Sequence, residues 1–472
     1  MLSSYPLLKD CAVRGSGQEL FLQNYLDGKE YALSTMQARA LSQCDGSMDI
    51  VSMASSIHCS PDSLVGFFES FEPTGLLNFS QEPSPIKLPK PLEREPYLQE
   101  VQIEVTGKCN LWCGHCYARQ HFADIGSSMM SLSEIKDVLS QMFRLNIGRC
   151  FLTGGEVFTR KDVPEIIRSM KDNCVHVSGI FTNGTIYRED ILDALRETGM
   201  KTRLLVSIDG NNAETHEAIR GRGTFSRSIA FLHKVIDAGF SVTVNTMVVK
   251  PNAKNLIDMR EFLEDMGVFS WRVSVPREQG EMLLNRESLD LPWTEVFRAY
   301  KGLLTRVIDV PGKMRVQIGS IFRENFLRDG RYYVYHDDSG TCQYKRWSVV
   351  LSSNGDVLPC PAGVCLNFGS IRSQSLEDIW YSANAQTFKS LPISATGCSS
   401  CDIRQYCGGG CRVNAKRLNG SYLARDDDAC TLYRFFAEEI RPILEQKGVV
   451  PEYLPHMPEY LYNPSVIDLW QP

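Results

Sequence analysis

The sequence predicts an α/β protein built on a partial (β/α)6 TIM-like barrel, with a winged-helix-like domain before the barrel and a cysteine-rich domain after it. Three observations lead to this fold. Strand-like and helix-like segments alternate from residue 98 to about residue 276. A hairpin, three helices and a strand are expected within residues 1–80. Of the 16 cysteines, 11 lie in two zones, 109–116 and 342–430. A chain of 472 residues is too long for one core, so two to four domains are expected.

Residues 1–80 are predicted to form the first domain. The turn pair Asp27-Gly28 separates two strand-like runs, which indicates a hairpin. Ser60 is expected to cap the third helix, with Pro61 in its first turn. The expected elements are strands at 21–25, 30–33 and 76–79 and helices at 35–44, 48–57 and 61–72. DNA-binding winged helices share this order. However, 4 Lys or Arg against 9 Asp or Glu give this segment a net charge of −5, and a phosphate backbone needs the opposite sign.

Residues 81–97 are predicted to be a linker. The segment carries five prolines, which block helices and central strands. We therefore expect an extended, semi-rigid spacer that spans at most about 50 Å.

Residues 98–285 are predicted to form the barrel core. Alternating strands and helices indicate parallel βαβ units with right-handed crossovers. The expected strands are 98–105, 150–152, 176–181, 202–208, 241–249 and 270–275. The expected helices are 131–145, 162–173, 188–198, 226–238 and 252–266. In such barrels the carboxyl ends of the strands form one reactive rim.

Polar and glycine residues fall at these strand ends. They are the run 109–116, Thr153-Gly154-Gly155-Glu156, Thr182-Asn183-Gly184, Ser207-Ile208-Asp209-Gly210 and Asn245. Each alone is also typical of turns and helix caps. Together on one rim they predict a site for a polar small molecule, because adjacent glycines let a ligand approach the backbone and Glu156 offers a carboxylate to an ammonium group.

The run Cys109-x3-Cys113-x2-Cys116 is the feature around which the chain is organised. Thiolates are the usual ligands of iron–sulfur clusters, four to a cluster, so three leave one iron open. The alternative is a structural zinc site completed by His115.

With Gly154-Gly155-Glu156 on the next strand, this cysteine motif resembles that of the radical S-adenosylmethionine (SAM) enzymes. The resemblance implies that the open iron chelates the amino and carboxylate groups of SAM. It implies that Gly154, Gly155 and Glu156 contact the amino group and that the backbone of His115 meets the adenine. Ser207 and Arg220 match positions that hold the carboxylate and ribose region, and Asn183 is a weaker match.

The second cysteine zone, within residues 341–433, resembles the SPASM extension of radical SAM enzymes; a pair of zinc ribbons is the alternative. SPASM domains hold two auxiliary clusters, so the resemblance implies three 4Fe-4S clusters in all. Cys398, Cys401, Cys407 and Cys430 would ligate the second auxiliary cluster. Cys342, Cys360 and Cys411 would ligate the first. Either Cys365 is the fourth ligand of that first cluster, or the cluster has an open iron that binds a substrate thiolate.

The remaining segments carry less information. Residues 286–340 are expected to bridge two domains, with an amphipathic helix over 293–308. Residues 434–472 are expected to hold the rest of a closing helix that runs over 431–446, stops at Gly448 and is followed by an irregular tail.

Taken together, these domains resemble the maturases of ribosomally made peptides, above all the thioether-forming sactipeptide and ranthipeptide synthases. Residues 1–80 resemble a RiPP recognition element, which binds the leader of a precursor peptide as an added strand. The resemblance implies that a 5′-deoxyadenosyl radical takes a hydrogen from a peptide carbon, to which a cysteine sulfur then bonds. An external one-electron donor, such as flavodoxin or ferredoxin, is implied as a further partner. The sequence indicates no acid or base.

Two other functions stay open at this point. One is a radical SAM peptide enzyme that forms carbon–carbon crosslinks, epimerises or decarboxylates. The other is a zinc-stabilised peptide-binding protein without catalysis. A net charge of −6 argues against nucleic acid, and no apolar run is as long as a membrane span. The first residues lack signal-peptide features, so we expect a cytoplasmic protein, whose cysteines are metal ligands rather than disulfides.

Overall fold

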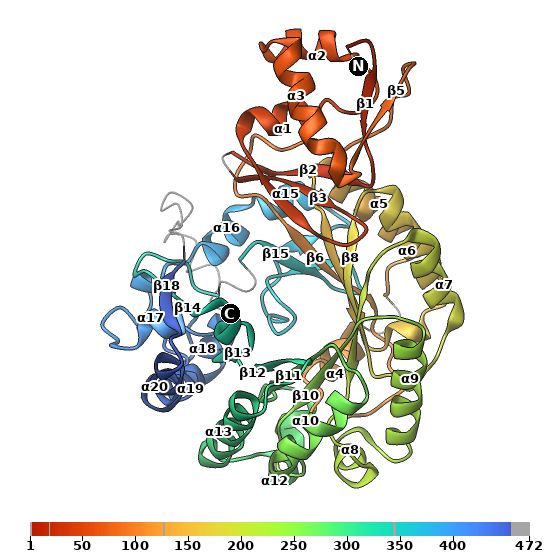
Figure 1. Ribbon diagram of the computed structural model, residues 1–472. Coiled ribbons are helices and arrows are strands. Elements are labelled where there is room, and N and C mark those ends of the chain that lie inside the picture. Colours follow the sequence, from red (N-terminus) through yellow and green to blue (C-terminus); the bar gives the residue numbers. More distant parts are fainter. Residues whose placement is uncertain (1, 18, 126–127, 343–345, 455–472) are drawn as a thin grey trace.

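The structure is a computed structural model that describes residues 1–472 except 1, 18, 126–127, 343–345 and 455–472. Its centre is one sheet of eleven strands in the order β13-β12-β11-β10-β9-β8-β7-β6-β15-β16-β17. The eight strands from β12 to β15 run parallel. The sheet curves around a central space without closing into a barrel, and the outer helices cover its convex side (Figure 1).

All six predicted barrel strands are present, and the sheet extends beyond them at both ends. The parallel strands are β6 (Glu100–Thr106), β7 (Arg149–Gly154), β8 (His176–Thr182), β9 (Arg203–Ser207), β10 (Val242–Met247), β11 (Ser270–Ser274), β12 (Arg315–Ile318) and β15 (Ser348–Leu351). The antiparallel strands are β13 (Phe322–Arg323), β16 (Asp356–Leu358) and β17 (Gly369–Ser370). Thus the cysteine-rich region itself contributes to the central sheet, because β15 pairs with β6.

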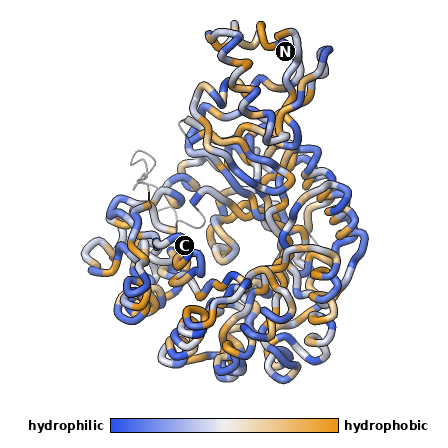
Figure 2. The backbone as a smooth tube through the Cα atoms, in the orientation of Figure 1, coloured by the Kyte–Doolittle hydropathy of each residue, from blue (hydrophilic) through white to orange (hydrophobic). Residues whose placement is uncertain are grey.

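The predicted core helices are confirmed within a few residues at each end. They are α5 (Leu132–Arg144), α6 (Val163–Asp172), α7 (Glu189–Thr198), α9 (Phe225–Asp237) and α10 (Leu256–Asp265). α5 begins at a capping box in which Ser131 and Glu134 satisfy each other's backbone N–H groups. Two further helices, α4 (Arg119–Ile125) and α8 (Ala213–Arg220), follow the cysteine loop and β9. Hydrophobic stretches gather on the strands and on the helix sides that face them (Figure 2).

The first domain contains the predicted hairpin and three helices. Its elements are β1 (Tyr5–Leu8), β2 (Cys11–Ser16), β3 (Glu19–Asn24), β4 (Glu30–Leu33), α1 (Thr35–Leu41), α2 (Ile50–Ile57), α3 (Pro61–Phe71) and β5 (Leu77–Ser80). Ser60 caps α3 as expected. The final strand pairs with β1 rather than with the hairpin, and β2 adds a third strand to that hairpin. In the order β2-β3-β4, strand β4 is an edge strand, and Glu30, Tyr31 and Ala32 on it are exposed.

The first domain is docked firmly onto the barrel through Arg14. This side chain is fully buried, and its guanidinium donates to Asn146 Oδ1 (2.9 Å), to the Asn146 carbonyl and to the Cys174 carbonyl. Asn146 returns a hydrogen bond to the Val13 carbonyl (3.1 Å). The segment 81–97, which the structure describes in full, forms no helix, and its one strand-like contact is an isolated bridge between Leu92 and Ser16. It is not a free spacer, because the Trp380 indole donates to the Pro96 carbonyl (2.7 Å). The docking therefore fixes where the edge of β4 lies relative to the barrel.

Replacing Arg14 by Met is expected to lower the free energy of unfolding by about 1–3 kcal/mol, since buried carbonyl oxygens lose their donor. Chemical denaturation followed by fluorescence measures this. The matched control is Arg39→Met, because Arg39 is exposed on α1 and such changes cost less than about 0.5 kcal/mol. Equal stability of the two variants would contradict the docking role of Arg14.

The remaining elements are α11 (Glu281–Leu284), α12 (Arg286–Leu289), α13 (Trp293–Asp309), α14 (Asn325–Asp329), β14 (Arg331–Val334), α15 (Leu376–Trp380), α16 (Ala383–Lys389), α17 (Arg404–Cys407), α18 (Arg412–Asn419), α19 (Asp427–Phe435), α20 (Arg441–Gln446) and β18 (Val450–Tyr453). Of these, β14, α17, α18, α19, α20 and β18 lie across the central space from the outer helices α6, α7 and α9 (Figure 1). α13 and the closing helix were both predicted. The tail beyond residue 454 lies outside the described residues. Of the helices described, none has both the length and the apolar character needed to cross a membrane.

Candidate active site

The loop after β6 carries the first three cysteines and is held against the end of β7. The Gly155 N–H donates to the Thr106 carbonyl (2.7 Å), and the Glu156 N–H donates to the Lys108 carbonyl (2.8 Å). A Cβ at Gly155 would lie 2.3 Å from the Lys108 carbonyl oxygen, which no side chain tolerates. The glycines therefore bring the second strand into direct contact with the cysteine loop.

Cys109, Cys113 and Cys116 line one large cavity of about 1230 Å³. Burial raises the pKa of Cys113 to about 11; the Arg220 guanidinium opposes this rise, and the Cys116 and Cys109 thiols add to it. The three sulfurs are thus close enough to influence one another. They supply three of the four ligands that a 4Fe-4S cluster takes, so the donor set fits such a cluster with one position left for a ligand from the cavity. Within the described ranges, no three His, Cys, Asp or Glu side chains are close enough to share a single metal ion.

Glu156 lies behind the cavity wall and ties two strand ends together. Its carboxylate accepts hydrogen bonds from the Thr182 hydroxyl (2.7 Å), the Asn183 N–H (2.7 Å) and the Phe158 N–H (3.1 Å). Burial raises the pKa of Glu156, and these hydrogen bonds oppose the rise. Glu156 is not among the residues that line the cavity, so contact with an ammonium group there stays a prediction.

A buried ion pair holds Arg220 at the cavity wall. The Arg220 Nε lies 2.6 Å from Asp209 Oδ2, and the His115 Nε2 lies 3.8 Å from the same oxygen. Burial would raise the pKa of Asp209, but its neighbours, above all the Arg220 guanidinium, hold that pKa below its usual value. Burial lowers the pKa of His115 to about 4, so this imidazole is neutral at neutral pH. The pair therefore fixes Arg220 next to Cys113, whose sulfur lies 3.8 Å from Arg220 Nη1.

The predicted site residues lie around one cavity, as expected for residues at the carboxyl ends of parallel strands. His115, Gly154, Gly155, Asn183, Ser207 and Arg220 all line the same cavity as the three cysteines. Asn183 donates to Asn110 Oδ1 (2.9 Å) in the cysteine loop. Ser207 and Asn245 are register partners on β9 and β10.

The opposite wall of the cavity carries a second group of cysteines. Burial and the neighbouring Cys360 and Cys411 thiols raise the pKa of Cys342 to about 11. All three line the cavity that Cys109, Cys113 and Cys116 also line. Cys365 is exposed and does not line it. The first predicted auxiliary set is therefore gathered around one point on the cavity wall, and Cys365 is not part of that wall.

The four cysteines of the other predicted auxiliary set also lie together. Burial raises the pKa of Cys407, and Asp426, Cys398 and Cys430 raise it further. Burial, Cys398 and Cys401 raise the pKa of Cys430. These mutual effects match a complete set of four thiolate ligands.

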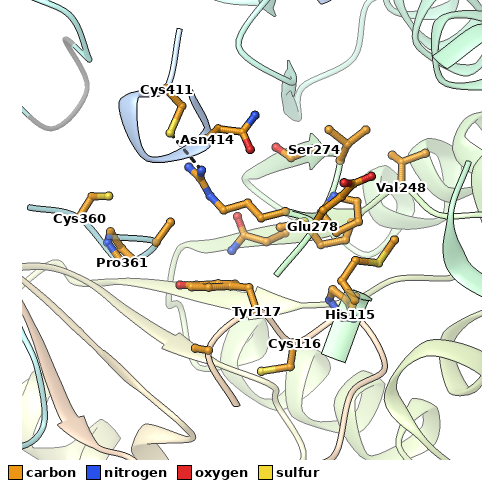
Figure 3. Close-up of a pocket in the computed structure, with 18 of the residues that line it drawn as sticks. His115, Cys116, Tyr117, Val248, Ser274, Glu278, Cys360, Pro361, Cys411 and Asn414 are labelled. Atoms are coloured by element: carbon orange, nitrogen blue, oxygen red, sulfur yellow. Dashed lines mark hydrogen bonds between the residues drawn. The ribbon is translucent and has the colours of Figure 1, made fainter. Parts of the chain in front are cut away.

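Arg277 and Tyr117, which were not predicted as site residues, lie between the two groups of cysteines. The Arg277 guanidinium donates to Cys411 Sγ (3.3 Å), the hydrogen bond drawn at Cys411 in Figure 3. Tyr117 lies between Cys116 and Cys360 (Figure 3), and it is 37% exposed where it lines the cavity. Arg277 follows the sixth predicted strand, so the strand-end rule that selected Ser207 could have found it.

Comparison with known proteins agrees with this geometry. Residues 103–263 match the model of the radical SAM superfamily. An AdoMet-dependent heme synthase from Methanosarcina barkeri is 30% identical over 344 residues, which cover 71% of this chain and 96% of that protein. The chain belongs to the radical SAM superfamily. Within it, residues 342–402 match the SPASM iron–sulfur cluster-binding domain.

Two other similar proteins extend the comparison of this radical SAM enzyme. PqqA peptide cyclase from Granulibacter bethesdensis is 26% identical over 356 residues, 74% of this chain and 92% of that protein. The crystal structure of Streptococcus suis SuiB bound to its precursor peptide SuiA has a TM-score of 0.64 at 16% identity. The structural match covers 90% of this chain and 99% of SuiB. Residues 98–472 alone make up a smaller share of this chain than 90%. The shared fold therefore includes part of the N-terminal region.

Proposed function

We propose that this radical SAM enzyme modifies a ribosomally synthesised precursor peptide by forming thioether bonds between cysteine sulfurs and carbons of other residues. One observation carries the proposal: the Cys342, Cys360 and Cys411 group and the Cys109, Cys113 and Cys116 group line the same cavity. A thiol-binding position and a position for SAM would thus face one peptide segment. PqqA peptide cyclase and SuiB, to which the chain is similar, have peptide substrates by name or by structure.

Three 4Fe-4S clusters and SAM are the proposed cofactors. SAM with its cluster supplies a radical that removes a hydrogen atom from carbon, and auxiliary clusters supply electron acceptance and an iron for a thiolate. The chain would hold SAM with Gly154, Gly155, Ser207, Asn183 and Arg220. Cys342, Cys360 and Cys411 would leave the first auxiliary cluster one open position, since Cys365 does not line the cavity with them. A one-electron donor is the remaining partner.

The N-terminal domain is proposed to bind the leader of the precursor. β4 is an exposed edge strand, and edge strands accept an added peptide strand through main-chain hydrogen bonds. Because Arg14 docks this domain rigidly, a bound leader would start at a fixed distance from the cavity. The chain itself contributes binding and orientation rather than an acid or base.

The product decides between the proposed chemistry and its rival. The anaerobically reconstituted enzyme is incubated with SAM, a reductant and the cysteine-containing peptide encoded beside its gene. Each thioether removes two hydrogens and one thiol, so we expect a mass loss of about 2 Da per link and one fewer thiol that iodoacetamide can alkylate. The same mass loss with every thiol retained would contradict thioether formation and indicate a carbon–carbon crosslink.

A further inference from the structure

Among the described residues, one arginine of the cavity wall has neither a hydrogen bond nor an ion pair. Four arginines line it: Arg119, Arg220, Arg272 and Arg277. Arg119 lies 3.8 Å from Glu281, Arg220 pairs with Asp209, and Arg277 donates to Cys411. Within the part of the chain that the structure describes, Arg272 has neither a hydrogen bond nor an ion pair. Its charge is therefore available to a ligand.

Arg272 is placed toward the cavity by the alternation of β11. Trp271 and Val273 on either side of it are fully buried in the core, so Arg272 projects from the other face of the strand. Burial lowers the pKa of Arg272, and the nearby Arg203 and Arg323 lower it further. Like charges and partial desolvation make a free guanidinium costly, and an anion would relieve both.

A second unsatisfied donor lies beside it. Asn245 on β10 is the register partner of Arg272, so the two side chains are neighbours on the same face of the sheet. Asn245 also lines the cavity, and its Nδ2 is buried without a hydrogen-bond partner among the described residues. A planar guanidinium fork next to an amide N–H donor suits a carboxylate.

We propose that Arg272 and Asn245 bind a carboxylate of the precursor peptide and so select a substrate with an acidic group near the residue that is modified. This inference rests on the proposed function. The cavity of about 1230 Å³ exceeds the usual range for a single small ligand, about 300–1,000 Å³, so it can hold more than one group. Arg272 lies two strands from Ser207, or about 10 Å, on the side away from the first cysteine loop.

The acidic residues on the cavity wall do not compete for Arg272. Glu278 pairs with Arg286 and Arg417, both at 3.1 Å. Asp426 accepts from the Cys411 N–H (2.7 Å) and from Asn414, and Asp428 pairs with Arg417 (3.3 Å). Asp290, which also lines the cavity, lies 3.5 Å from Arg286. Each of these carboxylates has a partner of its own, so the carboxylate that Arg272 binds comes from a substrate.

The test compares Arg272→Gln with the wild-type enzyme on matched peptides. The peptides are the precursor, its variants with each Asp or Glu changed in turn to Asn or Gln, and a form amidated at its C-terminus. Arg272→Gln is expected to lower kcat/KM for peptide modification by about 10- to 100-fold while the Kd for SAM stays unchanged. For one peptide variant, the wild-type enzyme is expected to show the same fall in kcat/KM. Arg272→Gln is expected to lower kcat/KM for that variant no further. Arg315→Gln is the control, since Arg315 is exposed and outside the cavity.

The outcomes distinguish failure of the carboxylate site from failure of the proposed function. Wild-type activity in Arg272→Gln, or losses that simply add for every peptide, would overturn the carboxylate site and leave the proposed function intact. A weakened Kd for SAM would assign Arg272 to the SAM carboxylate and overturn it as well. If the wild-type enzyme changes the mass of no peptide, the proposed function and this inference both fail.

Discussion

Replacing Cys109, Cys113 and Cys116 together by Ala is expected to abolish the release of 5′-deoxyadenosine from SAM, a loss of at least about 1000-fold, because residues that act as one unit fail together. The three thiols lie in one loop and line one cavity, and the thiols of Cys116 and Cys109 add to the rise that burial causes in the pKa of Cys113. Without them the chain offers no ligands for the cluster that SAM needs. Chromatography of anaerobic reactions measures the released nucleoside.

Cys59→Ala is the control for this experiment. Cys59 is a half-buried cysteine of the first domain and has no place on the cavity wall. It should release 5′-deoxyadenosine at the wild-type rate and bind the same amount of iron. Release of 5′-deoxyadenosine by the triple variant would refute the assignment of the first cluster site.

Replacing Cys342, Cys360 and Cys411 by Ala is expected to separate SAM cleavage from product formation. The enzyme should still release 5′-deoxyadenosine, while crosslinked peptide falls by at least about 1000-fold, since the first auxiliary cluster is lost but the SAM site is not. Iron per chain should drop by about four from about twelve. Iron analysis and mass spectrometry of the peptide measure the two effects.

Cys365→Ala tests whether the three cysteines act without a fourth. Because Cys365 is exposed and does not line the cavity, its replacement is expected to leave iron content and crosslinking unchanged. Iron loss of about four per chain in Cys365→Ala would make this residue a ligand and close the open position. The comparison therefore decides the alternative that the spacing of the cysteines leaves open.

The sequence predicted best the features that depend on residues close together in the chain. The six barrel strands, the core helices and the capped helix α3 follow from periodicity and capping residues. The strand-end rule placed Ser207 and Arg220 at one cavity, because parallel strands end on one side of the sheet. The resemblance to SPASM domains implied two groups of auxiliary ligands, and the mutual pKa effects show that cysteines of each group lie near one another.

The missed features depend on contacts between distant segments. β15 joins the barrel by pairing with β6, although about 240 residues separate them. β1 and β5 pair across the whole first domain. The Asp209–Arg220 ion pair and the Arg277–Cys411 hydrogen bond also form only once the chain has folded. Hydrophobic periodicity and cysteine spacing do not predict such long-range contacts. The neighbours of Glu156 and Arg277 are therefore known only from the folded structure.

The transfer of hydrogen from the peptide to SAM tests the central claim most directly. The wild-type enzyme is reconstituted anaerobically and incubated with SAM, a reductant and a precursor peptide in which all carbon-bound hydrogens are deuterium. The proposed function predicts deuterium in the 5′-deoxyadenosine, matched by crosslinks formed in the peptide. If 5′-deoxyadenosine forms without deuterium while the peptide stays unmodified, this enzyme cleaves SAM for another substrate and the peptide assignment is wrong.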